Sequence, residues 1–285
     1  MEIVRRGLAT RAGWTRVLVV TVYAAAMGYV EAAAVVYIRL IVGGVDPMSR
    51  VRTPPPIPLG PAEVGREAAT IVMLATVALL AGRRWSGRWG AFVLAFGVWD
   101  ITYYLFLALL VGWPRSVLDW DILFLIPLPW WGPVLAPTLI AAAMCLSGAV
   151  LLLREARGDR PTFPRAAASA GVLGALLCLY VFMAEAVAAL AGSGADVRTL
   201  RPTTFPWPLF LLGYVPLAWG FLGVALAPNA TSARLAGGHS RAAIPARIDM
   251  AAIPEASVNG GPSSSAPDSP TAAVGPRDDG GQVPR

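Results

Sequence analysis

Two carboxylic acids lie inside apolar stretches of the sequence, where an acid is rare and costly. Glu31 falls within segment 17–42, and Asp100 falls within segment 89–112. A carboxylate near the centre of a bilayer is costly to insert, so each acid should face the interior of a helical bundle and there pair, hydrogen-bond or take up a proton. We therefore predict that Glu31 and Asp100 form a proton or cation site near the middle of the membrane.

Two tyrosines extend this predicted site along the same helix. Tyr103 and Tyr104 follow Asp100 by three and four positions, a spacing that places both phenol hydroxyls on the helical face of the carboxyl group. The three residues should form one polar stripe.

Small residues precede both acids. Gly28 lies one turn before Glu31, and Gly97 lies one turn before Asp100. A glycine in a membrane helix lets another backbone approach closely. The spacing therefore predicts that the two acids are neighbours in the bundle.

Two further charged residues are predicted outer partners of this site. Arg39 follows Glu31 by eight positions and should either pair with a carboxylate on another helix or extend to the membrane surface. Glu185 lies toward the outer end of segment 166–191. It is either a second, shallower acidic partner or a lone acid packed at a helix contact.

The connector 113–129 is long, and prolines interrupt it. We predict a short interfacial or re-entrant helix here, before the fourth span, that begins at Ser116 or Asp119. Asp119 and Asp121 form a D-x-D pair that can bind Mg²⁺ or Ca²⁺ if the backbone is not helical. Helix capping and anchoring at the interface are the alternative roles.

Composition indicates which elements position these residues. Of 285 residues, 56% are hydrophobic and 14% are charged, which is typical of a chain whose solvent is lipid. About 20 apolar residues in a helix cross a bilayer. We predict an all-α, polytopic transmembrane bundle in residues 1–228, with six spans at 17–42, 67–82, 89–112, 133–153, 166–191 and 206–227.

The 23 basic residues are all arginine, and their distribution predicts the topology. Arginines are frequent before the first span and in connectors 83–88 and 154–165, whereas the connectors on the other side contain fewer, except the one after the first span. Because arginine-rich connectors stay in the cytoplasm, both termini should be cytoplasmic. The protein itself should lie in the cell membrane, that is, the inner or plasma membrane. The arginines form no single stripe suited to nucleic acid, so no nucleic-acid partner is expected.

Residues 229–285 change to alanine, glycine, proline and serine with scattered charges, which predicts a disordered cytoplasmic tail. The single histidine, His239, lies in this tail, which argues against imidazole-ligated metals and haem. Cys145 and Cys178 lie in apolar runs without a C-x-x-C pair, so neither a disulfide framework nor a zinc site is indicated. We expect no cofactor.

Three runs carry a resemblance to a known group of proteins: 28–32 (GYVEA), 99–104 (WDITYY) and 120–130 (WDILFLIPLPW). Across residues 28–137 the chain resembles bacterial multi-pass membrane proteins whose activity is uncharacterised. The resemblance implies a membrane setting and nothing about chemistry.

Three classes of function follow from these residues. The leading hypothesis is a transporter-like protein for a small solute, cation or proton, in which Glu31 and Asp100 form the site. The alternatives are a non-catalytic membrane scaffold or assembly protein, and a membrane-embedded enzyme acting on a lipid or isoprenoid. The lipid bilayer is the expected partner, with a small cation, a proton or a lipid as ligand. Oligomeric state does not follow from the sequence.

Overall fold

A computed structural model describes residues 2–41, 60–192 and 204–229 of the chain. Apart from Asn229, the predicted tail lies outside the described residues, and so does His239. The prediction that the tail is disordered therefore stays a prediction.

Helices make up most of the described chain, and all of them are long. In chain order they are α1 (Glu2–Ile41), α2 (Gly60–Ala81), α3 (Trp85–Val111), α4 (Leu135–Ala156), α5 (Arg165–Gly192) and α6 (Trp207–Leu226). Six helices in the described chain are long and apolar enough to cross a membrane, and the first of these spans begins at Ala9. The predicted all-α bundle with six spans is confirmed, and the chain is a multi-pass membrane protein.

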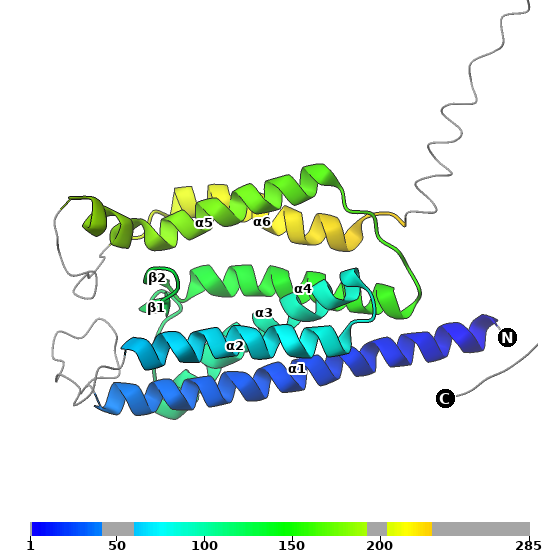
Figure 1. The fold of residues 1–285 in the computed structure, drawn as a ribbon, viewed down its shortest axis with the longest axis horizontal. Coiled ribbons are helices and arrows are strands. Elements are labelled where there is room, and N and C mark those ends of the chain that lie inside the picture. The colour runs from blue at the N-terminus through cyan, green and yellow to red at the C-terminus, as the bar shows by residue number, and fades with distance from the viewer. Residues whose placement is uncertain (1, 42–59, 193–203, 230–285) are drawn as a thin grey trace, which may run out of the picture. The chain divides into compact units, whose positions relative to one another are not determined.

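The helices α3 and α4 occupy the middle of the bundle (Figure 1). They pack against each other, with α1 and α2 on the far side of α3 and the α5–α6 pair beside α4. The contact between α3 and α1 is also extensive. Any side chain of α3 that faces inward therefore meets α1, α2 or α4, and this placement decides the surroundings of Asp100.

Glycines allow α5 and α6 to approach closely. A methyl group added to Gly171 would lie 3.1 Å from the Cα atom of Gly220, and one added to Gly213 would lie 3.1 Å from the carbonyl oxygen of Gly174. Small residues at such contacts give membrane helices the van der Waals contact that holds them together in lipid. The α5–α6 pair is thus a tightly packed unit beside α4.

The connector between α3 and α4 folds as a β-hairpin, so the predicted interfacial helix is wrong. Strand β1 (Trp120–Phe124) pairs antiparallel with β2 (Trp130–Pro133), with Ile122 opposite Trp131. Pro127 and Pro129 remove backbone donors and prevent a helix from continuing, whereas the aromatic and β-branched residues on either side favour strands. Pairing across the hairpin satisfies backbone groups that would otherwise be buried without partners.

Asp119 does cap the backbone before this hairpin, although not at a helix. Its Oδ2 atom accepts hydrogen bonds from the backbone N–H groups of Arg115, at 2.7 Å, and Ser116, at 3.2 Å. The aspartate closes a turn in the way that Asp side chains do outside regular structure. This contact fixes the point at which the chain enters β1.

Candidate functional site

Glu31 is buried on α1 and forms an ion pair with Arg66 of α2. Thr70, one turn further along α2, donates a hydrogen bond from its hydroxyl to Glu31 Oε2 at 3.3 Å. Arg66 also pairs with Glu63 at 3.0 Å. A guanidinium group and a hydroxyl of α2 thus stabilise the charge of Glu31, which the sequence predicted to need a partner.

Arg39 forms a buried ion pair with Asp121, with 3.0 Å between Arg39 Nη2 and Asp121 Oδ1. The guanidinium group also lies over the indole ring of Trp113, 4.1 Å from its centroid. Arg39 therefore pairs instead of extending to the membrane surface, but its partner belongs to strand β1 and not to another helix. The contact joins the end of α1 to the hairpin.

Asp100 differs from Glu31 and Asp121 because it forms no ion pair among the described residues, and its buried Oδ2 atom makes no hydrogen bond there. The residue retains some accessible surface. It lies close enough to Asp121 for the two carboxyl groups to interact electrostatically. Tyr103 and Tyr104 also interact electrostatically with Asp100, which fits the predicted stripe on α3. No hydrogen bond between Asp100 and either tyrosine is found in the described chain.

The two glycines that precede the acids face different helices. A methyl group added to Gly28 would lie 3.1 Å from the carbonyl oxygen of Trp99 and 3.1 Å from the amide nitrogen of Tyr103, so α1 and α3 meet there. One added to Gly97 would instead approach Ala141 of α4 to 2.5 Å. Gly28 brings Glu31 toward α3, but no hydrogen bond joins Glu31 to Asp100 in the part of the chain that the structure describes. Arg66 and Tyr103, which interact electrostatically, connect the two acids indirectly.

Glu67 is a buried member of this region that sequence reasoning missed. Its carboxylate accepts a hydrogen bond from the backbone N–H of Leu125 at 2.9 Å, at the end of β1. In the sequence, Glu63 and Glu67 lie at the start of the second span, where acids stabilise the N-terminus of a helix, and this pattern does not indicate a partner in the hairpin. Arg66 lies in the connector before the predicted second span, and its spacing of three residues from Glu63 is the signal that could have indicated an ion pair along one helix.

These residues form one group of charges at the hairpin side of the bundle, which we call the acidic cluster. It contains more carboxylates than guanidinium groups: the acids are Glu31, Glu63, Glu67, Asp100 and Asp121, and the bases are Arg39 and Arg66. Burial strengthens electrostatic interactions among such groups, so a surplus of acids favours the uptake of a positive charge.

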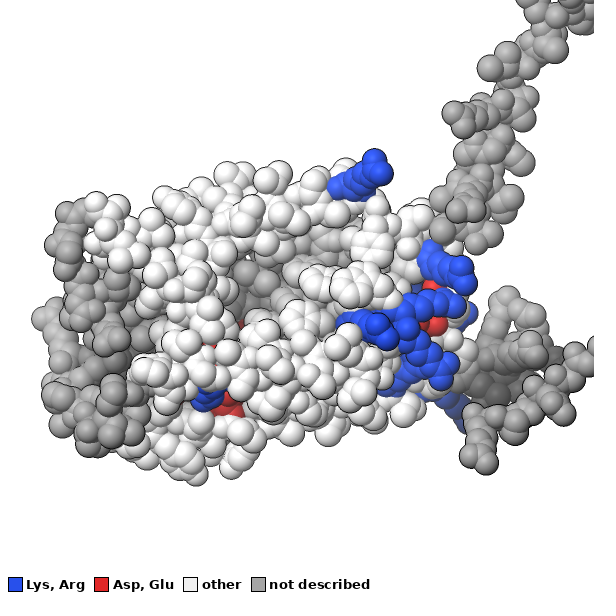
Figure 2. All heavy atoms as spheres, viewed as in Figure 1, with Lys and Arg blue, Asp and Glu red and all other residues white. Residues whose placement is uncertain are grey.

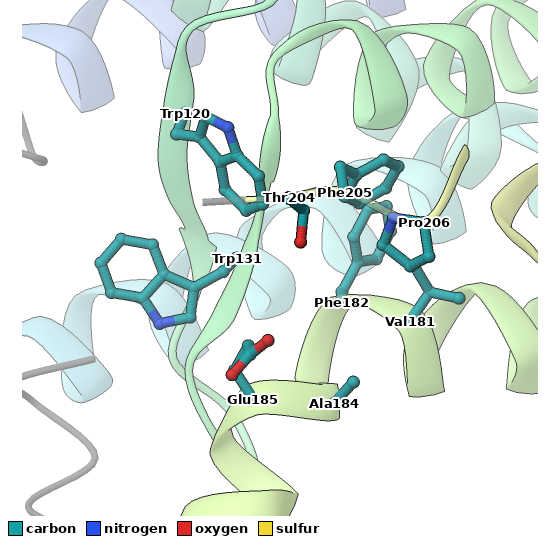
Figure 3. A pocket seen from close by; sticks show the side chains of 9 residues that line it. All are labelled: Trp120, Trp131, Val181, Phe182, Ala184, Glu185, Thr204, Phe205 and Pro206. Atoms are coloured by element: carbon teal, nitrogen blue, oxygen red, sulfur yellow. The ribbon is translucent and has the colours of Figure 1, made fainter. Parts of the chain in front are cut away.

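Three predicted residues, Asp119, Asp121 and Glu185, have roles other than those predicted or lie elsewhere. Asp119 binds the backbone of its own turn, whereas Asp121 faces Arg39, so the structure gives the D-x-D pair two separate roles. No group of three or more histidine, cysteine, aspartate or glutamate residues suited to a metal ion occurs among the described residues. Glu185 is exposed on α5 and lines a cavity beside the hairpin (Figure 3), and Asp100 is not among the residues that line this cavity.

A second charged group, which we call the Glu155 cluster, lies at the opposite end of the helices. Figure 2 shows basic side chains gathered at the end where α1 begins. Glu155 of α4 accepts a 3.0 Å contact from Arg16 and hydrogen bonds from the backbone N–H groups of Arg83 and Arg84 at 3.2 and 2.5 Å. Sequence reasoning did not single out Glu155, because it lies among arginines in a polar connector.

The fold and the two clusters define the class: a six-span α-helical membrane protein with charged groups buried between its helices. No protein-family model, curated protein or solved structure matches the chain significantly.

Proposed function

We propose that this protein is a transporter-like membrane protein that binds a proton or a small cation at Asp100. The observation that carries the proposal is the buried Oδ2 atom of Asp100, which has no hydrogen-bond partner in the described chain. Carboxylates inside membrane bundles are expensive to keep unless they are paired, and they recur in proton relays and ion pathways for that reason. Asp100 is thus the member of the acidic cluster best suited to bind and release a charge.

The neighbouring charges support this role. Both guanidinium groups of the cluster already contact other acids, Arg39 with Asp121 and Arg66 with Glu31. Asp100 therefore receives the field of Asp121 without a base of its own among the contacts found. A proton or cation on Asp100 would relieve this repulsion.

The orientation of the protein in the membrane is a separate part of the proposal. We propose that the end bearing the Glu155 cluster faces the cytoplasm. The gathered arginines in Figure 2 support this orientation through the positive-inside rule. Both termini would then be cytoplasmic. Reporter fusions after Gly87 and Gly158 should report cytoplasm, and fusions after Pro61, Arg115 and Ser193 should report the outside. An outside signal at Gly87 would reverse the assignment.

The test of the site is ion flux in proteoliposomes. The purified chain is reconstituted with an internal pH-sensitive dye, and a pH gradient is applied alone or with Na⁺ or K⁺. The wild-type protein should change the pH gradient across the vesicle membrane, either alone or when Na⁺ or K⁺ is present. Asp100→Asn should lose this activity, because Asn keeps the shape of the side chain but cannot ionise. Asp159→Asn, which removes a carboxylate near the Glu155 cluster, is the matched control and should retain flux. Equal flux in wild type and Asp100→Asn, or no flux in either, would contradict the proposal.

A scaffold or assembly protein is the second candidate, and one observation favours it. Ion pairs join elements far apart in sequence, as Glu31–Arg66, Arg39–Asp121 and Arg16–Glu155 do. If Asp100 is only structural, the melting temperatures of wild type and Asp100→Asn should differ by a constant amount between mildly acidic and alkaline pH. If it titrates, the difference should change with pH, because only the wild type exchanges a proton at this position.

A further inference from the structure

A cavity of about 260 Å³ lies beside the β-hairpin, outside the acidic cluster. Strands β1 and β2 form one side, α5 forms another, and the residues just before α6 close the space (Figure 3). The cavity is smaller than the ~300 to 1,000 Å³ typical of drug-sized ligand sites, so it suits a small molecule or one chemical group.

Four of the nine residues that line the cavity are aromatic. The indole rings of Trp120 and Trp131 lie on the hairpin side, and Phe182 and Phe205 lie across the cavity (Figure 3). Trp120 meets Phe205 edge to face, with 6.0 Å between ring centroids, and Phe182 stacks with Phe205 at 6.1 Å. These contacts hold the rings in place around the space. The faces of indole and phenyl rings carry partial negative charge and attract cations.

The polar groups in the wall point to the same kind of ligand. The Glu185 carboxylate and the Thr204 hydroxyl both point into the space between the rings (Figure 3). Glu185 makes no ion pair or hydrogen bond within the described residues, and none of the described residues that line the cavity is basic. A carboxylate beside several aromatic faces repels anions. One carboxylate and one hydroxyl also fall short of the six or more oxygens that Ca²⁺ takes.

We propose that this cavity binds the ammonium or quaternary ammonium group of a small organic cation. Glu185 would neutralise the charge, and the rings of Trp120, Trp131 and Phe205 would surround it, as aromatic cages do for quaternary ammonium groups. The ligand has two possible sources with the same chemistry: a free amine in the aqueous phase, or the head group of a zwitterionic lipid. The site shares no residue with the proposed site at Asp100. It gives Glu185 a role other than the outer partner of Glu31 and Asp100 that the sequence predicted.

The first experiment measures binding of free cations to the full chain in detergent by isothermal titration calorimetry. Choline and tetramethylammonium are the probes, and 3,3-dimethylbutan-1-ol, which has the shape of choline without its charge, is the control ligand. Choline should bind saturably and the alcohol should not. Glu185→Gln and Trp120→Leu should each weaken binding about tenfold, because each removes one of the two attractions on the cation.

The matched control for Trp120→Leu is Trp85→Leu, which changes a tryptophan that is 71% exposed on α3. Trp85→Leu should bind choline as the wild type does. Glu185 is exposed and makes no hydrogen bond or ion pair among the described residues. The melting temperature of Glu185→Gln should therefore stay at the wild-type value. This variant keeps the proposal testable even if Trp120→Leu fails to fold.

The second experiment tests a lipid source. The chain is placed in nanodiscs of phosphatidylglycerol doped with phosphatidylcholine or phosphatidylethanolamine, and the lipids that stay bound are identified by native mass spectrometry. Retention of a zwitterionic lipid by wild type, and its loss in Glu185→Gln, would assign the site to a head group. Saturable choline binding without such retention would assign it to a free cation. If neither occurs, or if Glu185→Gln behaves as wild type in both experiments, the proposal is wrong, whatever the outcome of the flux assay.

Discussion

The acidic cluster and the Glu155 cluster both place carboxylates among arginines, yet they differ in how those carboxylates are satisfied. Glu155 accepts one contact from a guanidinium group and two from backbone N–H groups, and several arginines surround it. At the hairpin side the acids outnumber the bases, and an oxygen of Asp100 lacks a hydrogen bond among the described residues. A fully satisfied carboxylate stabilises the fold, whereas one left without a partner suits reversible binding.

The largest effect on stability is expected when the buried Arg39–Asp121 pair is broken. Arg39→Met leaves Asp121 without its guanidinium group in the interior, which should lower the free energy of unfolding by about 3 to 5 kcal/mol. The measurement is thermal or denaturant unfolding in detergent. The double variant Arg39→Met/Asp121→Asn should recover most of the loss, because no uncompensated charge remains buried. A double variant no more stable than Arg39→Met would show that the loss comes from the missing pair and not from an uncompensated buried charge.

A smaller loss is expected at the Glu155 cluster. Glu155→Ala removes the acceptor for the N–H groups of Arg83 and Arg84 and the partner of Arg16, and should lower the free energy of unfolding by about 2 to 3 kcal/mol. The matched control is Asp159→Ala, whose pair with Arg154 is longer, at 3.5 Å, and more exposed. That control should lose only about 0.5 kcal/mol. If both variants lost the same free energy of unfolding, Glu155 would stabilise this end of the bundle no more than Asp159 does.

The smallest effect concerns the hydroxyl that supports Glu31. Thr70→Val removes the hydrogen bond to Glu31 while Arg66 remains, and should lower the free energy of unfolding by about 1 kcal/mol. Thr76→Val is the control one and a half turns further along α2, because that exposed hydroxyl binds only the backbone of Val72 in the described chain. The control should unfold like the wild type. An equal loss in both variants would mean that the effect comes from the helix backbone and not from the acidic cluster.

Several features of the site were predictable because they depend on a single helix. Glu31 and Asp100 were identified as acids within spans, and the spacing of Tyr103 and Tyr104 placed them on the face of Asp100. For Arg39 the position near the end of a span left two alternatives, a carboxylate partner or extension to the membrane surface. Each of these inferences uses only helical periodicity and the cost of charge in lipid.

Other features depend on which helices pack together and on which residues along each helix come into contact. Gly97 faces α4 and not α1, and Glu185 lies at the cavity beside the hairpin and not beside Asp100. Arg66 and Glu155 resemble ordinary connector charges until α1 is placed next to them. Partners such as these are separated by tens of residues, and no local pattern in the chain indicates their register.

The sequence by itself determined that the chain is a six-span helical membrane protein with acids in its interior, because hydrophobic length and the cost of buried charge act locally. Only the tertiary structure decided that Arg66 and Arg39 neutralise Glu31 and Asp121 while Asp100 keeps an oxygen without a hydrogen bond in the described chain. It also decided that the connector after α3 forms a hairpin and brings Trp120 and Trp131 to Glu185. The physical reason is that pairing and enclosure require elements distant in sequence to meet, and packing between the helices sets those meetings.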